Sequence, residues 1–341
     1  MLEDDLEILL ITYDRSKDLE KTLTQVLNSP FKNCKITVID NCSPDETPQV
    51  CAHFEKLFSN LEIIRHKKNI GSSPNYLRAV ELSSSNYTWV LCDDDSFDFS
   101  DCSDVIEAIE SSEYDVILVG AETQFEWERG LKTSTKDLID KGARYYSTLG
   151  FIPSCIFKTE NYDANCIYKG YYNVQNIYPH FPFINKTVEE NCSVYVSQKR
   201  IVYWGDKNLP GFPEIDIFIG WLNCCHNIKD KEIRLKAIKG SPHYNGSRGL
   251  ISAIALEKLR KDGRSHSEII FPLLSAYVPA FGFSRDQFML LIAIGLTLTP
   301  TLLIRNLIKL RLYFKYNRNG EEVPELLYSY IFEDERFKRG H

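Results

Sequence analysis

YTWVLCDDDS, residues 87–96, joins a run of aromatic, β-branched and aliphatic side chains to three consecutive carboxylates. The first half shows no polar alternation, which is typical of a strand buried inside a parallel sheet. Asp93, Asp94 and Asp95 come where that strand leaves the sheet, and open α/β sheets bind ligands at the carboxyl ends of their strands. Mg²⁺ and Mn²⁺ prefer oxygen ligands. The stretch therefore predicts either a metal and diphosphate site or a solvated turn that caps the next helix.

Three earlier segments repeat this arrangement of a buried strand followed by polar residues. The strands are predicted at 7–12, 35–39 and 61–65, and an amphipathic helix follows each of them. Strand–helix alternation with short connections predicts a parallel sheet with right-handed crossovers, so all four polar clusters gather at one edge. The sequence has neither GxGxxG nor GxxxxGK[ST], so the dinucleotide fingerprint and the P-loop are absent.

The bulk composition is that of a globular protein, with 43% hydrophobic and 26% charged residues in 341. A formal net charge of -7 argues against binding to nucleic acid. The ten cysteines are scattered without CxxC or zinc-ligand spacing, which predicts reduced structural thiols. The acidic start, MLEDDLEILL, lacks the basic region of a secretory signal. These features favour a cytoplasmic protein.

Four segments together resemble the family-2 inverting glycosyltransferases, which have the GT-A fold. ITYDR at 11–15 is similar to that family's T-Y-N-R segment, and IDNCSPDET at 39–47 to its V-D-N-x-S-x-D-x-T segment. NIGSSPNYLRAV at 69–80 is similar to N-x-G-x-x-x-A-x-N, and DDDS at 93–96 to the D-x-D metal motif. Within the family, SPNYLRAVELSS and the DDD ending most resemble bacterial abequosyltransferase-like enzymes of O-antigen or capsule synthesis. The resemblance implies an α/β, Rossmann-like, mostly parallel sheet flanked by helices.

The resemblance also implies roles for the residues at the strand ends. Tyr13 would pack on a pyrimidine, and Asp40 would accept a hydrogen bond from the base, which does not distinguish UDP from CDP. Asp95, with Asp94, would hold Mn²⁺ or Mg²⁺. The residues implied in nucleotide-sugar binding are Thr12, Tyr13, Arg15, Asp40, Asn41, Ser43, Gly71, Asn75, Arg78, Asp93 and Asp94.

These residue types also have structural alternatives. Thr12 could cap a helix and Asp40 could form an Asx-turn. Arg78 lies on a predicted helix and could be a solvated charge. Gly71 could supply backbone freedom alone. Asp14 stands where the family usually has Asn, and its role is open.

An inverting transferase needs a general base for the attacking hydroxyl. The family usually supplies an Asp or Glu at the start of a helix, and Tyr178-Pro179-His180 holds this place here. Histidine titrates near neutral pH, which suits a base, so His180 is the predicted catalytic base. It could also be a metal ligand, an acceptor-binding donor or a structural residue. The fallback bases are Asp216, Glu189 and Glu190.

The segments after residue 98 are predicted less regularly. We expect a helix at 104–110 and strands at 115–120, at 149–158 with a bend at Pro153, and at 194–204. The aromatic residues between Tyr162 and Phe183 could form a sugar-stacking wall or a core. The expected domains are a GT-A catalytic domain at 1–210, divided into a nucleotide-binding half (1–98) and an acceptor half (99–210), and a mainly helical region at 211–341.

Gln287–Ile304 is a run of eighteen residues without charge, and basic residues alternate with apolar ones over 305–318. Eighteen apolar residues reach only the lower limit for a membrane span, and Pro300 and three threonines weaken that interpretation. Basic and apolar residues at helical spacing suit a helix at an anionic membrane surface. We therefore expect peripheral membrane contact through 287–318. A buried helix and an oligomer contact are the alternatives.

The sequence thus predicts a metal-dependent inverting glycosyltransferase with a UDP-, CDP- or similar sugar donor. The resemblance implies that the acceptor is a saccharide linked to undecaprenyl, at the inner face of the cytoplasmic membrane. A non-catalytic nucleotide-sugar-binding paralogue is one alternative. A nucleotidyltransferase is another, although Asp14-Arg15-Ser16 poorly matches a basic, glycine-rich phosphate loop.

Overall fold

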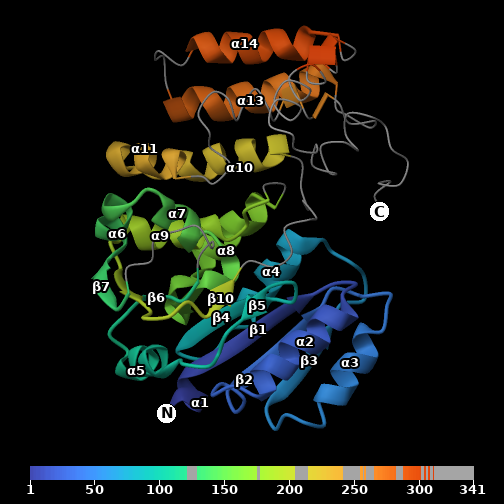
Figure 1. Cartoon of the computed structure of the whole chain (residues 1–341), viewed down its shortest axis with the longest axis vertical. Helices are drawn as coiled ribbons and strands as arrows, with labels where there is room; N and C mark the ends of the chain where they lie inside the picture. The colour runs from blue at the N-terminus through green and yellow to red at the C-terminus, as the bar shows by residue number, and fades with distance from the viewer. Residues whose placement is uncertain are drawn as a thin grey trace. The chain divides into compact units, whose positions relative to one another are not determined.

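The computed structural model describes most of the chain (Figure 1). The described residues are 1–120, 129–174, 177–203, 214–240, 254–255, 257–258, 265–281, 287–300, 303–304, 306–307 and 310. The chain divides into two compact units. The first comprises Met1–Lys207 and Asn227–Ser241, and the second comprises Asn208–His226 and Pro242–His341.

The first unit begins with the predicted fourfold alternation of strands and helices, which the structure confirms. A one-turn helix, α1 (Leu2–Asp5), precedes the first strand. The alternating elements are β1 (Leu6–Thr12), α2 (Ser16–Leu27), β2 (Lys35–Asp40), α3 (Thr47–Phe54), β3 (Leu61–Arg65), α4 (Ser72–Glu81) and β4 (Tyr87–Cys92). β1, β2 and β4 are buried on both faces, as is typical of the inner strands of a parallel sheet, whereas the edge strand β3 is only partly buried.

An eight-stranded sheet of order β3-β2-β1-β4-β8-β6-β9-β7 is the centre of this unit. β3, β2, β1 and β4 are parallel, as are β6 and β9, whereas β8 is antiparallel to both of its neighbours. The added strands are β6 (Val116–Leu118), β7 (Leu131–Ser134), β8 (Cys155–Lys158) and β9 (Ser193–Val196). This mostly parallel sheet flanked by helices confirms the predicted GT-A-like fold class.

The order in which the strands are connected determines where a ligand site is expected at the edge of the sheet. α2 and α3 lie together over one face of the sheet (Figure 1), and Leu19 and Phe54 join Ile8 and Trp89 in one buried cluster there. The chain runs from β1 outward to β2 and β3, and then returns through α4 to β4 on the other side of β1. The strand order therefore reverses between β1 and β4, which opens a crevice at their carboxyl ends.

The remaining elements of the first unit surround this sheet. β5 (Ser96–Phe97) pairs with β10 (Val202–Tyr203) in a small second sheet. The helices are α5 (Ser103–Ser111), α6 (Thr135–Lys141), α7 (Arg144–Leu149), α8 (Ala164–Tyr172), α9 (Phe181–Glu189) and α11 (Lys231–Lys239). Two 3₁₀ turns, η1 (Ile152–Ser154) and η2 (Thr159–Asn161), flank β8.

Two predicted strands are wrong in detail. The strand expected at 149–158 begins only at Cys155, because Pro153 occupies the 3₁₀ turn before it. The strand expected at 194–204 is two strands in different sheets, β9 and β10. The chain turns between them, and the Ser197 hydroxyl donates a 2.6 Å hydrogen bond to the Lys199 carbonyl.

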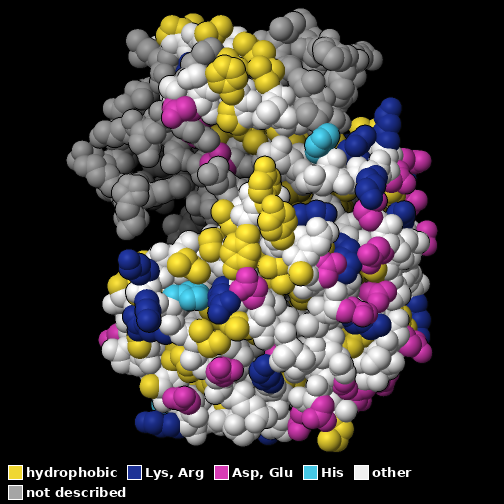
Figure 2. All heavy atoms as spheres, turned by 180° about the vertical axis from the view of Figure 1, so that it is seen from behind, with side chains coloured by type: hydrophobic (Ala, Val, Ile, Leu, Met, Phe, Trp, Pro, Cys, Tyr) yellow, Lys and Arg dark blue, Asp and Glu magenta, His cyan; other side chains and the backbone are white. Residues whose placement is uncertain are grey.

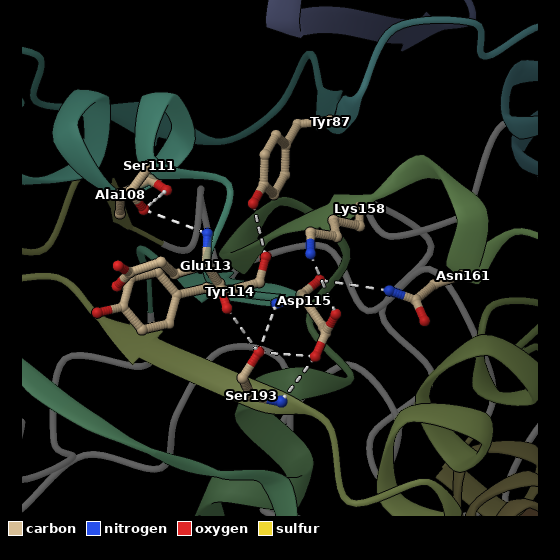
Figure 3. Close-up of polar contacts among 9 residues, drawn as sticks. All are labelled: Tyr87, Ala108, Ser111, Glu113, Tyr114, Asp115, Lys158, Asn161 and Ser193. Atoms are coloured by element: carbon tan, nitrogen blue, oxygen red, sulfur yellow. Dashed lines mark hydrogen bonds and ion pairs between the residues drawn. The ribbon is translucent and has the colours of Figure 1, made fainter.

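One cluster of polar contacts joins the parallel half of the sheet to its mixed half (Figure 3). Asp115 precedes β6, and its Oδ2 accepts hydrogen bonds from the Ser193 backbone N–H at 2.8 Å and hydroxyl at 2.7 Å. The Lys158 ammonium, at the end of β8, lies 3.5 Å from Asp115 Oδ1. The Tyr87 hydroxyl, at the start of β4, donates to the Tyr114 carbonyl at 2.6 Å. Four strands are therefore joined at the edge opposite the aspartates.

The second unit is helical in its described part. α10 (Glu214–His226) packs against α13 (His266–Phe281), which packs against α14 (Gln287–Leu298). The uncharged run Gln287–Ile304 is not one helix, because α14 ends at Leu298. A new turn starts at Pro300, and the Pro300 carbonyl accepts hydrogen bonds from the Leu303 and Ile304 N–H groups. None of the helices in the described part of the chain combines the length and hydrophobicity of a membrane-crossing segment.

Candidate functional site

Asp93 joins the two strands that border the crevice. Its Oδ2 accepts a 2.6 Å hydrogen bond from the hydroxyl of Thr12, the last residue of β1. Its Oδ1 accepts a 3.1 Å hydrogen bond from Arg15 Nη1. Asp93 is only 3% exposed, and this burial raises its pKa to about 6 although Thr12 and Arg15 act against the shift. Asp93 is therefore a buried residue that connects the end of β4 to Thr12 and Arg15.

Asp94 and Asp95 present carboxylates beside Cys92 at the end of β4. One ligand atom from each of these three residues lies within 4.8 Å of the others. Asp95 is buried and Asp94 is exposed, and Asp94 Oδ2 is 2.7 Å from Arg15 Nη1. Burial and the three neighbouring carboxylates raise the pKa of the Cys92 thiol well above its usual value. The two carboxylates therefore fit a hard divalent cation, while the thiol stays protonated beside them.

Asp40 is the last residue of β2 and is buried, at 1% exposed. Its Oδ1 accepts hydrogen bonds from the Ser43 N–H at 2.9 Å and hydroxyl at 2.6 Å, three residues on, rather than from the residue two positions on as in an Asx-turn. Its buried Oδ2 lies 3.4 Å from Arg65 Nε but accepts no aligned hydrogen bond. A carboxylate oxygen in this state can still accept from a ligand.

Ser43 connects Asp40 to the loop after β1. Its hydroxyl accepts a 2.9 Å hydrogen bond from the Asp14 N–H, and Asp14 adopts a left-handed φ of 55°. Asparagine and aspartate tolerate this conformation better than most residues, which accounts for Asp14 where the family has Asn. Tyr13, next to it, is 40% exposed and is available to a ligand.

Asn41 holds the loop after β3. Its Nδ2 donates to Asn69 Oδ1 at 2.8 Å, and its Oδ1 accepts from the Ile70 N–H at 2.9 Å. Gly71 follows with φ 90°, a conformation that strains any residue with a Cβ, and α4 starts after it. Asn75 is buried in the first turns of α4, with Oδ1 3.0 Å from His66 Nε2. Asn41, Gly71 and Asn75 therefore help to fix the conformation of the segment between β3 and α4.

Arg78 and Arg65 have different surroundings. Arg78 lies half-exposed on α4 and pairs with Glu81 at 2.5 Å. This ion pair does not involve the strand-end carboxylates, and the nucleotide role of Arg78 stays a prediction. Arg65 was not among the predicted site residues, yet it ends β3 directly opposite Asp40 in the strand register. That register, once the strands are aligned, is the signal that could have found it.

His180 immediately precedes α9, as predicted, but it is buried. Its Nε2 is 2.6 Å from the Gly150 carbonyl, which can only accept, so this nitrogen carries the proton. Nδ1 is buried and has no hydrogen-bond partner among the described residues. Burial lowers the pKa of His180 to about 4, so the ring is neutral at pH 7. Tyr76 and Tyr178 contact it edge-on.

The other predicted bases are spread over both units. Asp216 is half-buried on α10 in the second unit, whereas the strand ends belong to the first unit. Glu189 lies at the end of α9, where its carboxylate accepts from the Lys229 N–H at 2.6 Å. The base roles of His180 and Asp216 stay predictions.

The aromatic stretch contains both core and surface residues. Tyr162, Phe181 and Phe183 are buried. Tyr168 and Tyr172 are 67% and 80% exposed on α8, and their rings stack with centroids 6.5 Å apart. Figure 2 shows hydrophobic side chains gathered on one face of the molecule.

Known proteins share this architecture. Residues 7–190 match the family described as glycosyl transferase family 2. TuaG of Bacillus subtilis (strain 168), named for teichuronic acid biosynthesis, is 22% identical over 92 residues, which are 27% of this chain and 36% of TuaG.

Two crystal structures of S. aureus TarS 1-349 are similar in fold. The complex with UDP has a TM-score of 0.61 and 16% identity over 94% of both chains. The complex with UDP-GlcNAc has a TM-score of 0.60 and 14% identity over 94% of this chain and 93% of TarS. Because the family match covers more than half of the 341 residues, this protein belongs to glycosyl transferase family 2.

Proposed function

We propose that the protein transfers a sugar from a nucleoside diphosphate donor to a saccharide acceptor. The observation that carries this proposal is the pair of carboxylates Asp94 and Asp95 at the β1/β4 switch point, with the buried Asp40 at the end of the neighbouring strand β2. Membership of glycosyl transferase family 2 supports the reaction class. The TarS complexes with UDP and UDP-GlcNAc support a pyrimidine nucleotide donor.

We propose a task for each part of the donor site. Asp40 would accept a hydrogen bond from the base at its buried Oδ2, which has no hydrogen-bond partner among the described residues, and Tyr13 is exposed beside the neighbouring strand end. Asp94 and Asp95 would hold Mn²⁺ or Mg²⁺, which neutralises the charge of the departing diphosphate when bound. Arg15 pairs with Asp93 and Asp94, and we propose that it also contacts the diphosphate. Thr12 fixes the carboxylate of Asp93.

We place inversion at the anomeric carbon, with His180 as the first base to test and Asp216 as the second. A base must be unprotonated to accept the hydroxyl proton. The neutral ring of His180 meets this condition at Nδ1, which carries the lone pair. Because Nδ1 is buried, its use requires an acceptor hydroxyl that reaches between Tyr76 and Tyr178.

The acceptor class we propose is a lipid-linked saccharide of surface polysaccharide synthesis, with an undecaprenyl carrier. The name of TuaG supports a polymer of the bacterial cell wall. The finer likeness to abequosyltransferases, with an O-antigen product, stays part of this proposal. The enzyme would work in the cytoplasm at the inner face of the membrane, where such an acceptor is presented.

A thermal-shift panel of UDP, CDP, GDP and dTDP, each with and without Mn²⁺, tests the donor site. A ligand at 100 times its Kd stabilises a protein by about 2.7 kcal/mol. We expect one pyrimidine diphosphate to raise the melting temperature only with Mn²⁺, and Asp95→Asn to abolish that rise. Asp98→Asn is the matched control, because Asp98 is an exposed carboxylate paired with Lys199 at 2.9 Å.

The absence of a nucleotide effect in the wild type would contradict the proposed site. If a nucleotide binds with Mn²⁺ but no donor sugar is ever released or transferred, the non-catalytic paralogue is the better description. Formation of a new nucleoside diphosphate sugar from a sugar phosphate and a nucleoside triphosphate would instead favour the nucleotidyltransferase.

A further inference from the structure

Cys92 stands out among the ten cysteines of the chain. Eight of them are buried, and only Cys42 and Cys92 are half-exposed. Cys92 is also the residue whose Sγ lies within 4.8 Å of carboxylate oxygens of both Asp94 and Asp95. Among the described residues, this is the group of three or more His, Cys, Asp or Glu side chains that could hold a metal ion.

The fold explains why the thiol faces the carboxylates. Successive side chains of a strand point to opposite faces of the sheet. Trp89 and Leu91 belong to the buried cluster under α2 and α3, so Cys92 points to the other face, which α4 covers. The chain then turns at Asp93 and Asp94 before β5. Because of this turn, a carboxylate oxygen of Asp95 lies within 4.8 Å of the Cys92 thiol.

A thiol in this place changes which cations the site prefers. Hard cations take oxygen ligands, whereas thiolates select softer ones. Ligand atoms bind Zn²⁺ at about 2.0–2.3 Å, so three donors that lie within 4.8 Å of one another need to close only slightly around an ion. The ion pair of Asp94 with Arg15 must open for this closure.

We propose that Cys92 is a third metal donor, so that thiophilic cations such as Cd²⁺ and Zn²⁺ bind to Cys92, Asp94 and Asp95 and compete there with Mg²⁺ and Mn²⁺. In the binding step the S–H bond breaks, a sulfur–metal bond forms, and the proton passes to solvent, with no change in oxidation state. The inference rests on the cation site of the proposed function and adds the selectivity of that site. If Cys92 is a third donor, trace amounts of Cd²⁺ or Zn²⁺ displace Mg²⁺ or Mn²⁺ from the site.

Cadmium titration of the full chain tests this inference without any nucleotide. The probe is Cd²⁺ alone, followed by the ultraviolet charge-transfer band of a cadmium–thiolate bond. We expect a band that saturates at one equivalent in the wild type and is abolished in Cys92→Ser. Cys42→Ser, which removes the other half-exposed thiol, should leave the band unchanged. Asp95→Asn should weaken Cd²⁺ binding by about tenfold or more.

Competition with Mn²⁺ completes the test. Excess Mn²⁺ should remove the band from the wild type, and Cys92→Ser should change the Mn²⁺ affinity less than about threefold while Cd²⁺ affinity falls at least about tenfold. Cys92→Ala serves as a second variant, and thermal melting without metal shows whether each variant folds. A band that survives in folded Cys92→Ser, or one that Mn²⁺ does not compete with, would overturn the inference. A failed transfer assay with an intact band would instead count against the proposed function alone.

Discussion

His180 illustrates how one buried side chain can affect the stability of the fold. Its ring is neutral in the folded protein because burial lowers its pKa to about 4, whereas the unfolded chain takes up a proton near pH 6.5. Between these two values the unfolded state binds more protons than the native state. The free energy of unfolding therefore falls as the pH is lowered through this window.

We predict that His180 accounts for a loss of about 2 kcal/mol in the free energy of unfolding between pH 7 and pH 5. His180→Gln removes the titration and should flatten the pH dependence by that amount. Urea unfolding at both pH values measures the difference. His53→Gln, at an exposed position on α3, controls for the loss of a histidine elsewhere. Parallel pH profiles for the wild type and His180→Gln would show that the ring is not held neutral.

The site residues themselves were predictable only up to a point. Asp40 and the three aspartates could be placed at one sheet edge, because four buried strands each end in polar residues. Their partners could not be predicted in this way. The ion pairs of Arg15 with Asp93 and Asp94 depend on the loop that turns at Asp14, and the contact of Arg65 with Asp40 depends on strand register.

At the scale of elements, burial decides which strands can be recognised. β1, β2 and β4 are buried on both faces and read as continuous apolar runs, so their boundaries agree with the prediction within about two residues. β8 and β10 are short and owe their conformation to pairing with distant strands. Such pairing leaves little signal in the local sequence.

Asp115, just before β6, contacts Ser193 of β9 and Lys158 of β8. Its removal should therefore lower the free energy of unfolding. Burial acts against ionisation, but the hydrogen bonds from Ser193 hold the pKa of Asp115 below its usual value. Asp115→Ala leaves the Ser193 N–H and hydroxyl without this acceptor (Figure 3). We expect the free energy of unfolding to fall by about 1–3 kcal/mol, measured by urea denaturation at pH 7.

The matched control for this prediction is Glu113→Ala. Glu113 is an exposed carboxylate two residues away, and its contact with Ser193 is made through the backbone carbonyl. Its truncation should change the free energy of unfolding by less than about 0.5 kcal/mol. Equal losses in the two variants would mean that the Ser193 contacts do not stabilise the sheet. Lowering the pH below about 4 should narrow the difference between wild type and Asp115→Ala, because the protonated carboxyl is a weaker acceptor.

At the scale of the whole molecule, the second unit carries a group of exposed leucines. Leu303, Leu307 and Leu310 are 50%, 54% and 54% exposed, and their spacing of four and three residues places them on one side of a helix. Arg305 and Lys309 alternate with them in the sequence, although these two residues lie outside the described part of the chain. Exposed apolar residues among basic ones suit the surface of an anionic membrane.

We predict that the full chain binds vesicles that contain phosphatidylglycerol and not vesicles of phosphatidylcholine alone. Added salt should weaken the binding because it screens the basic residues. Replacing both Leu303 and Leu307 with Ser removes apolar area from the contact and should lower the partition coefficient roughly tenfold or more. Leu57→Ser, at a position 49% exposed in the first unit, is the control. Binding that is unchanged in the double variant would instead assign these leucines to a contact within or between protein chains, since burial against protein is the other use for such a surface.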